Sequence, residues 1–64
     1  MIKLILDTYY VVDARVIEPT EKGTRIVYAL ESKMIENHLF VLCELENKER
    51  RWIWNHYLHP ADIA

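Results

Sequence analysis

The chain has 64 residues, 52% of them hydrophobic, with a net charge of −2 from eight basic and ten acidic side chains. This length allows one domain, spanning residues 1–64, with a small core, and the single cysteine excludes an internal disulfide. The mild acidity argues against binding mainly through phosphate contacts, whereas the high apolar share favours a surface covered by a partner or by a second copy.

The first third of the chain predicts two strands. Residues 1–6 are a short apolar run, and residues 9–18 alternate between apolar and polar side chains with the period of two that is typical of a strand. Residues 18–23 contain one of the two prolines and the only glycine. We therefore expect a turn there, with Gly23 at a positive φ.

The middle of the chain predicts two further strands, over 24–30 and 38–44, separated by a loop. The loop, 31–37, is polar apart from Met34 and Ile35, which either contact a partner or fold back over the end of the domain. The segment 38–44 is the most apolar of the chain and predicts the central strand.

The last strand pattern carries both tryptophans. Residues 46–49 predict a hairpin turn in which Asn47 takes a positive φ, and residues 50–54 then alternate. Because Trp52 and Trp54 are two residues apart, they lie on the same side of a strand, opposite Ile53. Two arrangements are open: both indoles fill the core, or Ile53 does and both indoles lie outside.

Five short strands in so short a chain can bury a core by curling into a small barrel. The ending WIWNHYLHPADI resembles the close of an SH3-like barrel, including the Tudor-like and KOW-like relatives. There a strand leads into a one-turn 3₁₀ element, and a last short strand follows. Tyr57 matches the ligand-facing tyrosine of that element, while Trp54 stands where the family usually carries proline. The resemblance implies an all-β, five-stranded SH3-like small barrel with a short 3₁₀ turn near the C-terminus. The opening motif of signalling SH3 domains and the KOW glycine are absent, so it does not carry over the binding of proline-rich peptides.

We find no catalytic, cofactor or metal signature. Ser32 lies in a polar loop without an activating histidine, and Cys43 lies in mid-strand, where a buried thiol is the expected role. His56, His59 and Asp62 follow at intervals of three, but Pro60 intrudes and no fourth ligand is evident. We expect no enzyme, no cofactor and no metal site.

The aromatic residues give the strongest functional indication, because not all of them fit into a narrow barrel. The expected function is a non-enzymatic protein-binding module that docks an aromatic face on a larger protein or on its own copy. Its small size is typical of phage or mobile-element accessory proteins that modulate a host complex. The alternative is a nucleic-acid-binding barrel that stacks bases beside the basic side chains of Arg25, Lys48, Arg50 and Arg51. The expected partner surface contains Tyr9, Tyr10, Arg50, Arg51, Trp52, Trp54 and Tyr57.

Two further features concern location. The sequence contains no apolar run of the roughly 18 residues needed to span a membrane, and no signal peptide. A single thiol without a secretory signal is typical of a reducing compartment, so the sequence predicts a cytoplasmic protein.

Overall fold

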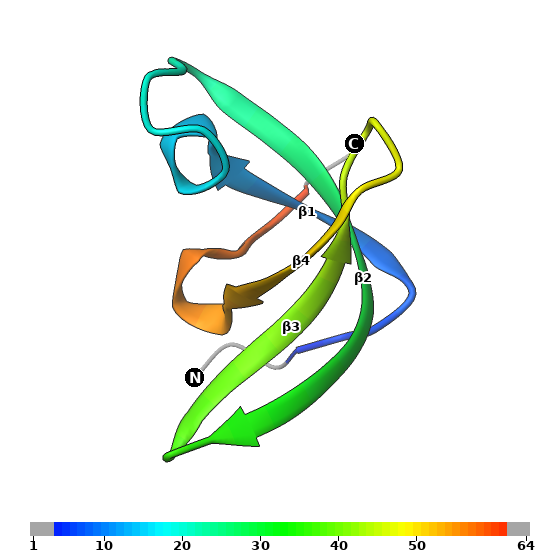
Figure 1. Cartoon of the computed structure of the whole chain (residues 1–64). Helices are drawn as coiled ribbons and strands as arrows, with labels where there is room; N and C mark the ends of the chain where they lie inside the picture. The colour runs from blue at the N-terminus through cyan, green and yellow to red at the C-terminus, as the bar shows by residue number, and fades with distance from the viewer. Residues whose placement is uncertain (1–3, 62–64) are drawn as a thin grey trace.

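In the computed structural model, which describes residues 4–61, five strands form one antiparallel sheet in the order β4-β3-β2-β1-β5 (Figure 1). The strands and two 3₁₀ turns are β1 (Thr8–Asp13), η1 (Ala14–Val16), β2 (Thr24–Ile35), β3 (His38–Glu44), β4 (Arg50–Trp54), η2 (Asn55–Tyr57) and β5 (His59–Pro60). The predicted all-β class, with a short 3₁₀ turn near the C-terminus, is confirmed. The strand pairing leaves the sheet open between β4 and β5, so the predicted barrel is not confirmed.

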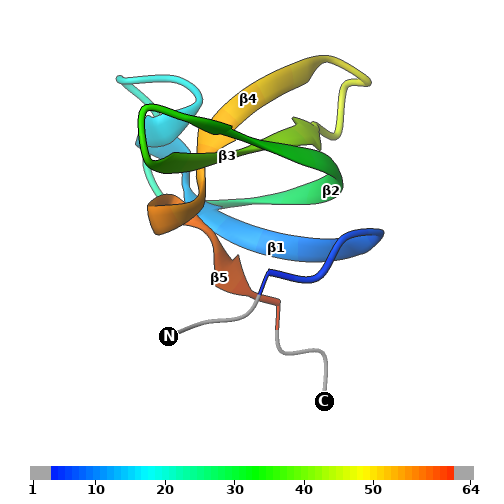
Figure 2. The same ribbon diagram turned by 90° about the horizontal axis from the view of Figure 1, so that it is seen from below.

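The long strand β2 belongs to both halves of the fold. Its first half pairs with β1, and its second half, from Tyr28 on, pairs with β3, with a register shift between Ala29 and Glu31. A bulge of this kind bends a strand and increases its twist. Figure 2 shows the result: β2 curves from the side of β3 and β4 to the side of β1 and β5.

The core fills the space inside this curved sheet, mostly with aliphatic side chains and with the ring of Tyr10. Alternate residues of β1 to β4 point inward, as the period of two requires. Each buried valine or leucine stabilises the fold by roughly 1.5–3 kcal/mol relative to an exposed one. The buried hydrophobic residues are Tyr10, Val12, Ala14, Ile17, Val27, Ala29, Val41, Cys43, Leu45, Ile53 and Leu58.

The first predicted strand is wrong for the described residues 4–6, which are irregular, while residues 1–3 lie outside the described part. Asp7 turns the chain with a φ of 58°, a conformation that aspartate tolerates better than most residues. The fifth strand is instead β5, which pairs with Tyr10 and Val11. Two residues are too few to produce a periodic pattern, so alternation did not indicate this strand. The resemblance to the close of an SH3-like barrel did imply a last short strand after the 3₁₀ element, and β5 lies there.

The second predicted strand, 9–18, ends five residues early, at Asp13. The Asp13 carboxylate accepts a hydrogen bond of 2.9 Å from the backbone N–H of Arg15, which caps η1 and ends the extended conformation. The turn that follows agrees with the prediction, since Gly23 has a φ of 96°.

The predicted loop over 31–37 is also wrong, because β2 continues to Ile35 and forms a hairpin arm with the start of β3. Every residue from 31 to 38 is exposed, so no alternation of buried and exposed positions marks this part of the strand. Glu36 and Asn37, with φ of 48° and 69°, make the two-residue turn. Met34 is 62% exposed and Ile35 42%, so neither folds back over the domain.

The β3–β4 hairpin has the predicted position but a different positive-φ residue. Lys48 takes it, at 75°, in a three-residue loop. Asn47 instead accepts a hydrogen bond of 3.1 Å from the N–H of Glu49 through its side-chain oxygen.

Candidate functional site

The structure decides which side of β4 faces the core. Ile53 pairs with Val41 and is 4% exposed, whereas Trp52 is 39% exposed and Trp54 is half-buried on the opposite side. The arrangement with Ile53 inside is confirmed, and the one with both indoles in the core is wrong. The core is already filled by aliphatic side chains, one cysteine and one tyrosine, and close packing leaves no room for two indoles.

The outward side chains of β3 and β4 form a continuous surface, which we call the aromatic face. The strand register sets which of these side chains are neighbours: Phe40 pairs with Trp54, and Leu42 pairs with Trp52. The turn η2 adds a third aromatic ring. The aromatic face consists of Phe40, Leu42, Trp52, Trp54 and Tyr57.

Tyr57 is held beside Trp54 by the geometry of η2. The Leu58 N–H donates to the Asn55 carbonyl at 3.0 Å, and the Leu58 side chain is buried at 3% exposure. This anchor leaves the preceding Tyr57 45% exposed, with its ring centroid 5.5 Å from that of Trp54 at an angle of 87°. Such an edge-to-face pair is favourable beyond its buried area.

Two histidines complete the surroundings of Trp54. The His38 ring lies perpendicular to the indole with centroids 5.5 Å apart, and the His56 ring lies 4.7 Å away at 31°. Together with Phe40 and Tyr57, His38 and Trp54 line an open depression of about 420 Å³. The depression is large enough to receive one side chain of a partner.

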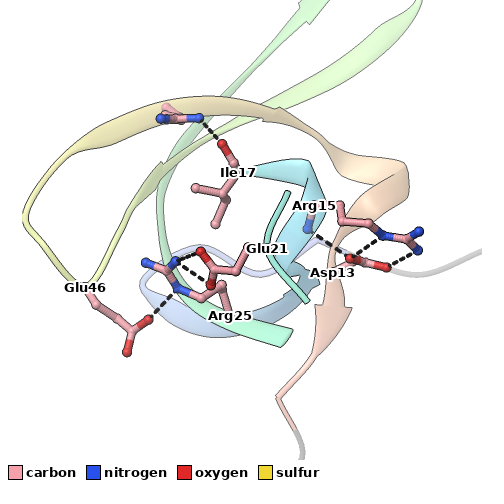
Figure 3. Close-up of polar contacts among 7 residues, drawn as sticks. Asp13, Arg15, Ile17, Glu21, Arg25 and Glu46 are labelled. Carbon is pink, nitrogen blue, oxygen red and sulfur yellow. Dashed lines mark hydrogen bonds and ion pairs between the residues drawn. The ribbon is translucent and has the colours of Figure 1, made fainter. Parts of the chain in front are cut away.

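A second depression, of about 500 Å³, is lined by Asp13, Arg15, Val16 and, like the first, by Tyr57. Asp13 and Arg15 form an ion pair at 2.9 Å, seen in Figure 3. Hydrogen bonds from Arg15 lower the pKa of Asp13 to about 2. Tyr57 therefore lines both an aromatic depression and one that includes a charged pair.

Trp52 lies at the other end of the aromatic face, below a lysine from β2. The Lys33 Nζ is 4.2 Å from the indole centroid, a cation–π geometry. Its contribution at so exposed a position is about 0.5–1 kcal/mol. The contact places one basic side chain, that of Lys33, beside the aromatic face.

The two predicted tyrosines of β1 do not join the aromatic face. Tyr10 is 4% exposed, so its assignment to a partner surface is wrong: its ring lies in the core and its hydroxyl both accepts from the Ile5 N–H and donates to the Ile5 carbonyl. Tyr9 is 51% exposed, but it packs edge-on against Tyr28, with centroids 4.9 Å apart.

The strand register separates Tyr9 from the indoles. Tyr9 pairs with Tyr28, Tyr28 with Glu44 and Glu44 with Arg50, so a charged pair lies between the tyrosines and Trp52. The Arg50 Nε is 3.4 Å from the Glu44 carboxylate. Tyr9 thus belongs to a separate depression, which also includes Ile26 and Tyr28.

The predicted basic residues have partners within the fold. Besides the Arg50 pair, Arg51 donates a 2.7 Å hydrogen bond to the Ile17 carbonyl, which connects β4 to the end of η1. Arg51 also lies 3.7 Å from the Glu49 carboxylate. Arg25 bridges Glu21 and Glu46, and these hydrogen bonds raise its pKa (Figure 3).

Sequence reasoning did not predict that Phe40 and Leu42 belong to the aromatic face, or that His38 and His56 lie beside Trp54. The alternation of residues 38–44 already places Phe40 and Leu42 on one side of their strand. Their position next to the indoles depends on the register between β3 and β4, which no single segment of sequence contains.

Cys43 has the inert environment expected of a core thiol. It is 0% exposed, and desolvation raises its pKa to about 11, so little thiolate forms at neutral pH. Within residues 4–61, no group of three or more side chains is placed to hold a metal ion, and Asp62, considered above, lies outside this part. The same described part contains no helix with the length and apolar character of a membrane span.

Comparisons of the chain with family models, with curated proteins and with solved structures find no match. The function of the chain is therefore inferred from the aromatic face and its surroundings rather than from similarity to known proteins.

Proposed function

We propose that this chain is a non-enzymatic protein-binding module that presents the aromatic face to a larger protein. The observation that carries the proposal is the exposed ring cluster around Trp54, which brings Tyr57, His38 and Phe40 to one depression. Tryptophan and tyrosine dominate the energetic centres of protein interfaces, because they bury a large area at a small cost in conformational entropy.

The aromatic face is suited to this role because it is already ordered. Trp52 and Trp54 belong to a strand paired with β3, and Tyr57 belongs to a turn anchored by Leu58. A partner would therefore order few side chains on binding, which lowers the free-energy cost of association. A protruding apolar or aromatic partner side chain would enter the depression beside Trp54.

A nucleic-acid-binding role has weaker support. Exposed rings can stack on bases, but Arg50 and Arg51 both lie against carboxylates, and Arg51 also bonds the Ile17 carbonyl. Phosphate would have to compete with these contacts. If this role is right, affinity for oligonucleotides should fall steeply between low and moderate salt, whereas we expect no binding even at low salt.

We further propose that the sheet is an SH3-like small barrel. Supporting this are the bent β2 shared by both halves, the 3₁₀ turn that carries Tyr57, and the return of β5 to pair with β1. The small size and the single reduced thiol agree with a cytoplasmic accessory protein of a phage or mobile element, which we propose as its setting.

The test is affinity capture from a host lysate with wild type and three single variants. Trp54→Ala and Tyr57→Ala remove rings from the aromatic face, and Tyr9→Ala removes an exposed ring from elsewhere. We expect the first two to lose a partner that wild type and Tyr9→Ala retain. Circular dichroism must show all four proteins folded. If folded Trp54→Ala and Tyr57→Ala keep every partner, the aromatic face is not the binding site.

A further inference from the structure

The two edges of the sheet differ in how they are protected against pairing with another chain. The edge strand β5 has two residues and includes Pro60, which has no N–H to donate. The opposite edge strand, β4, has five residues and no proline. Within residues 4–61, β4 pairs with β3 alone, so its other side carries backbone groups without a strand partner.

The hairpin shows which backbone groups these are. The Leu45 N–H donates to the Glu49 carbonyl at 2.7 Å, so this pair is hydrogen-bonded. Hydrogen-bonded pairs alternate along an antiparallel ladder, and Arg51 and Ile53 are therefore the residues of β4 that bond to β3. The N–H and C=O groups of Arg50, Trp52 and Trp54 point away from β3, toward the free edge.

Exposure along the strand agrees with an open edge. Arg50, Arg51 and Trp52 are all exposed, although successive side chains point to opposite sides of the sheet. The residues beside them on β3 are more covered: Cys43 is buried and Leu42 is half-buried. Solvent thus reaches the first half of β4 from the edge.

We propose that β4 pairs antiparallel with β4 of a second copy of this chain, about a two-fold axis that passes between the two Trp52 residues. This inference is independent of the proposed function, because it concerns the backbone edge of β4 rather than the outward rings that would meet another protein. The symmetric pair closes on itself, so association ends at a dimer.

The sequence of β4 is self-complementary in this register. With Trp52 on the axis, all five residues find a partner: Trp52 faces Trp52 of the second copy, Arg50 faces Trp54, and Arg51 faces Ile53. No like charges are directly opposed, and Arg50 beside an indole is a favourable cation–π pair. The Trp52 pair adds a cross-strand aromatic contact, typically worth up to about 1 kcal/mol.

Other symmetric registers are less favourable. An axis through Arg50 or Arg51 sets an arginine opposite its own copy, which is destabilising. An axis through Ile53 pairs three residues instead of five. The register centred on Trp52 also joins the two aromatic faces into one surface across the dimer.

The test is sedimentation velocity of the full chain from about 10 μM to about 1 mM, since a single pair of short strands makes an interface below the standard size. We expect the weight-average mass to rise toward that of two chains. Trp52→Lys sets two like charges on the axis and should weaken association by at least about tenfold. The matched control, Tyr9→Lys, adds the same charge at an exposed ring off the edge and should associate like wild type.

Amide hydrogen exchange on the wild type tests the same inference without any substitution. We expect exchange of the Trp52 N–H to slow as concentration rises, whereas the Arg51 and Ile53 amides, already bonded to β3, should not change. A protein that stays monomeric over the whole concentration range would overturn the inference. So would a dimer in which the Trp52 amide exchanges as fast as in the monomer, or a mass that grows past two chains.

Discussion

Replacing Ile53 by alanine, with Trp52→Ala as its counterpart, tests the orientation of β4. Ile53 is 4% exposed and packs in the core beside Val41. Truncating a buried isoleucine to alanine costs about 2–5 kcal/mol, from lost transfer free energy and from the cavity left behind. A domain of this length has a total stability of roughly 3–10 kcal/mol, so Ile53→Ala should remove about a fifth of it or more.

Trp52→Ala deletes more atoms but should cost less. The Trp52 side chain is 39% exposed, and its cation–π contact with Lys33 is worth about 0.5–1 kcal/mol at such a site. With its partial burial on β3, we expect a total loss near 1–1.5 kcal/mol.

Urea unfolding followed by circular dichroism measures both variants on one scale, with Trp54 fluorescence as a second probe. With a slope of about 1 kcal/mol per molar urea, the midpoint should fall by about 2 M or more for Ile53→Ala and by no more than about 1.5 M for Trp52→Ala. A larger loss for Trp52→Ala would show that the indole, not the isoleucine, is in the core, and would refute the orientation.

Three other predictions follow from single contacts. Tyr10→Phe removes both hydrogen bonds to Ile5 and should lower the free energy of unfolding by at most about 0.5–1.5 kcal/mol for each bond, because the exposed Ile5 backbone can bond to water instead. An unchanged urea midpoint would argue against a stabilising role of these two hydrogen bonds. Lys48→Gly relieves a φ of 75° and should raise thermal stability by about 0.5–1 kcal/mol, whereas a lower melting temperature would contradict a strained turn. The pKa of Cys43 is raised from 9.0 to about 11, so the folded state holds the thiol proton more tightly than the unfolded state does. The resulting stability is complete below pH 9 and is lost as the pH rises from 9 toward 11. Urea titrations should show this decline for the wild type and not for Cys43→Val.

Much of the sheet could be predicted from the alternation of apolar and polar residues, because that pattern reports one buried face. Residues 38–44 and 50–54 were assigned correctly for this reason. The same pattern failed over 31–35, where the hairpin arm is exposed on both faces, and over β5, which is too short to have a period.

The candidate site shows the limits of the same reasoning. Alternation places Trp52 and Trp54 together but does not say whether they face the core, because that choice depends on the size of the core the other strands provide. For Tyr10 the signal was present: it lies two residues before Val12 and four before Ala14, both buried, and so shares their face. The partners of Arg50 and Arg51 come from other segments, Glu44 and Ile17, and required the fold.

The most direct measurement is the broadening of side-chain NMR signals by a soluble paramagnetic agent, which reports how close each group lies to solvent. We predict strong broadening of the Trp52 and Tyr57 ring signals, weaker broadening for Trp54, and none for the Ile53 methyl groups, in line with their exposure. Broadened Ile53 methyl groups together with protected indole signals would contradict the outward aromatic face, and the binding role proposed for it would fall as well.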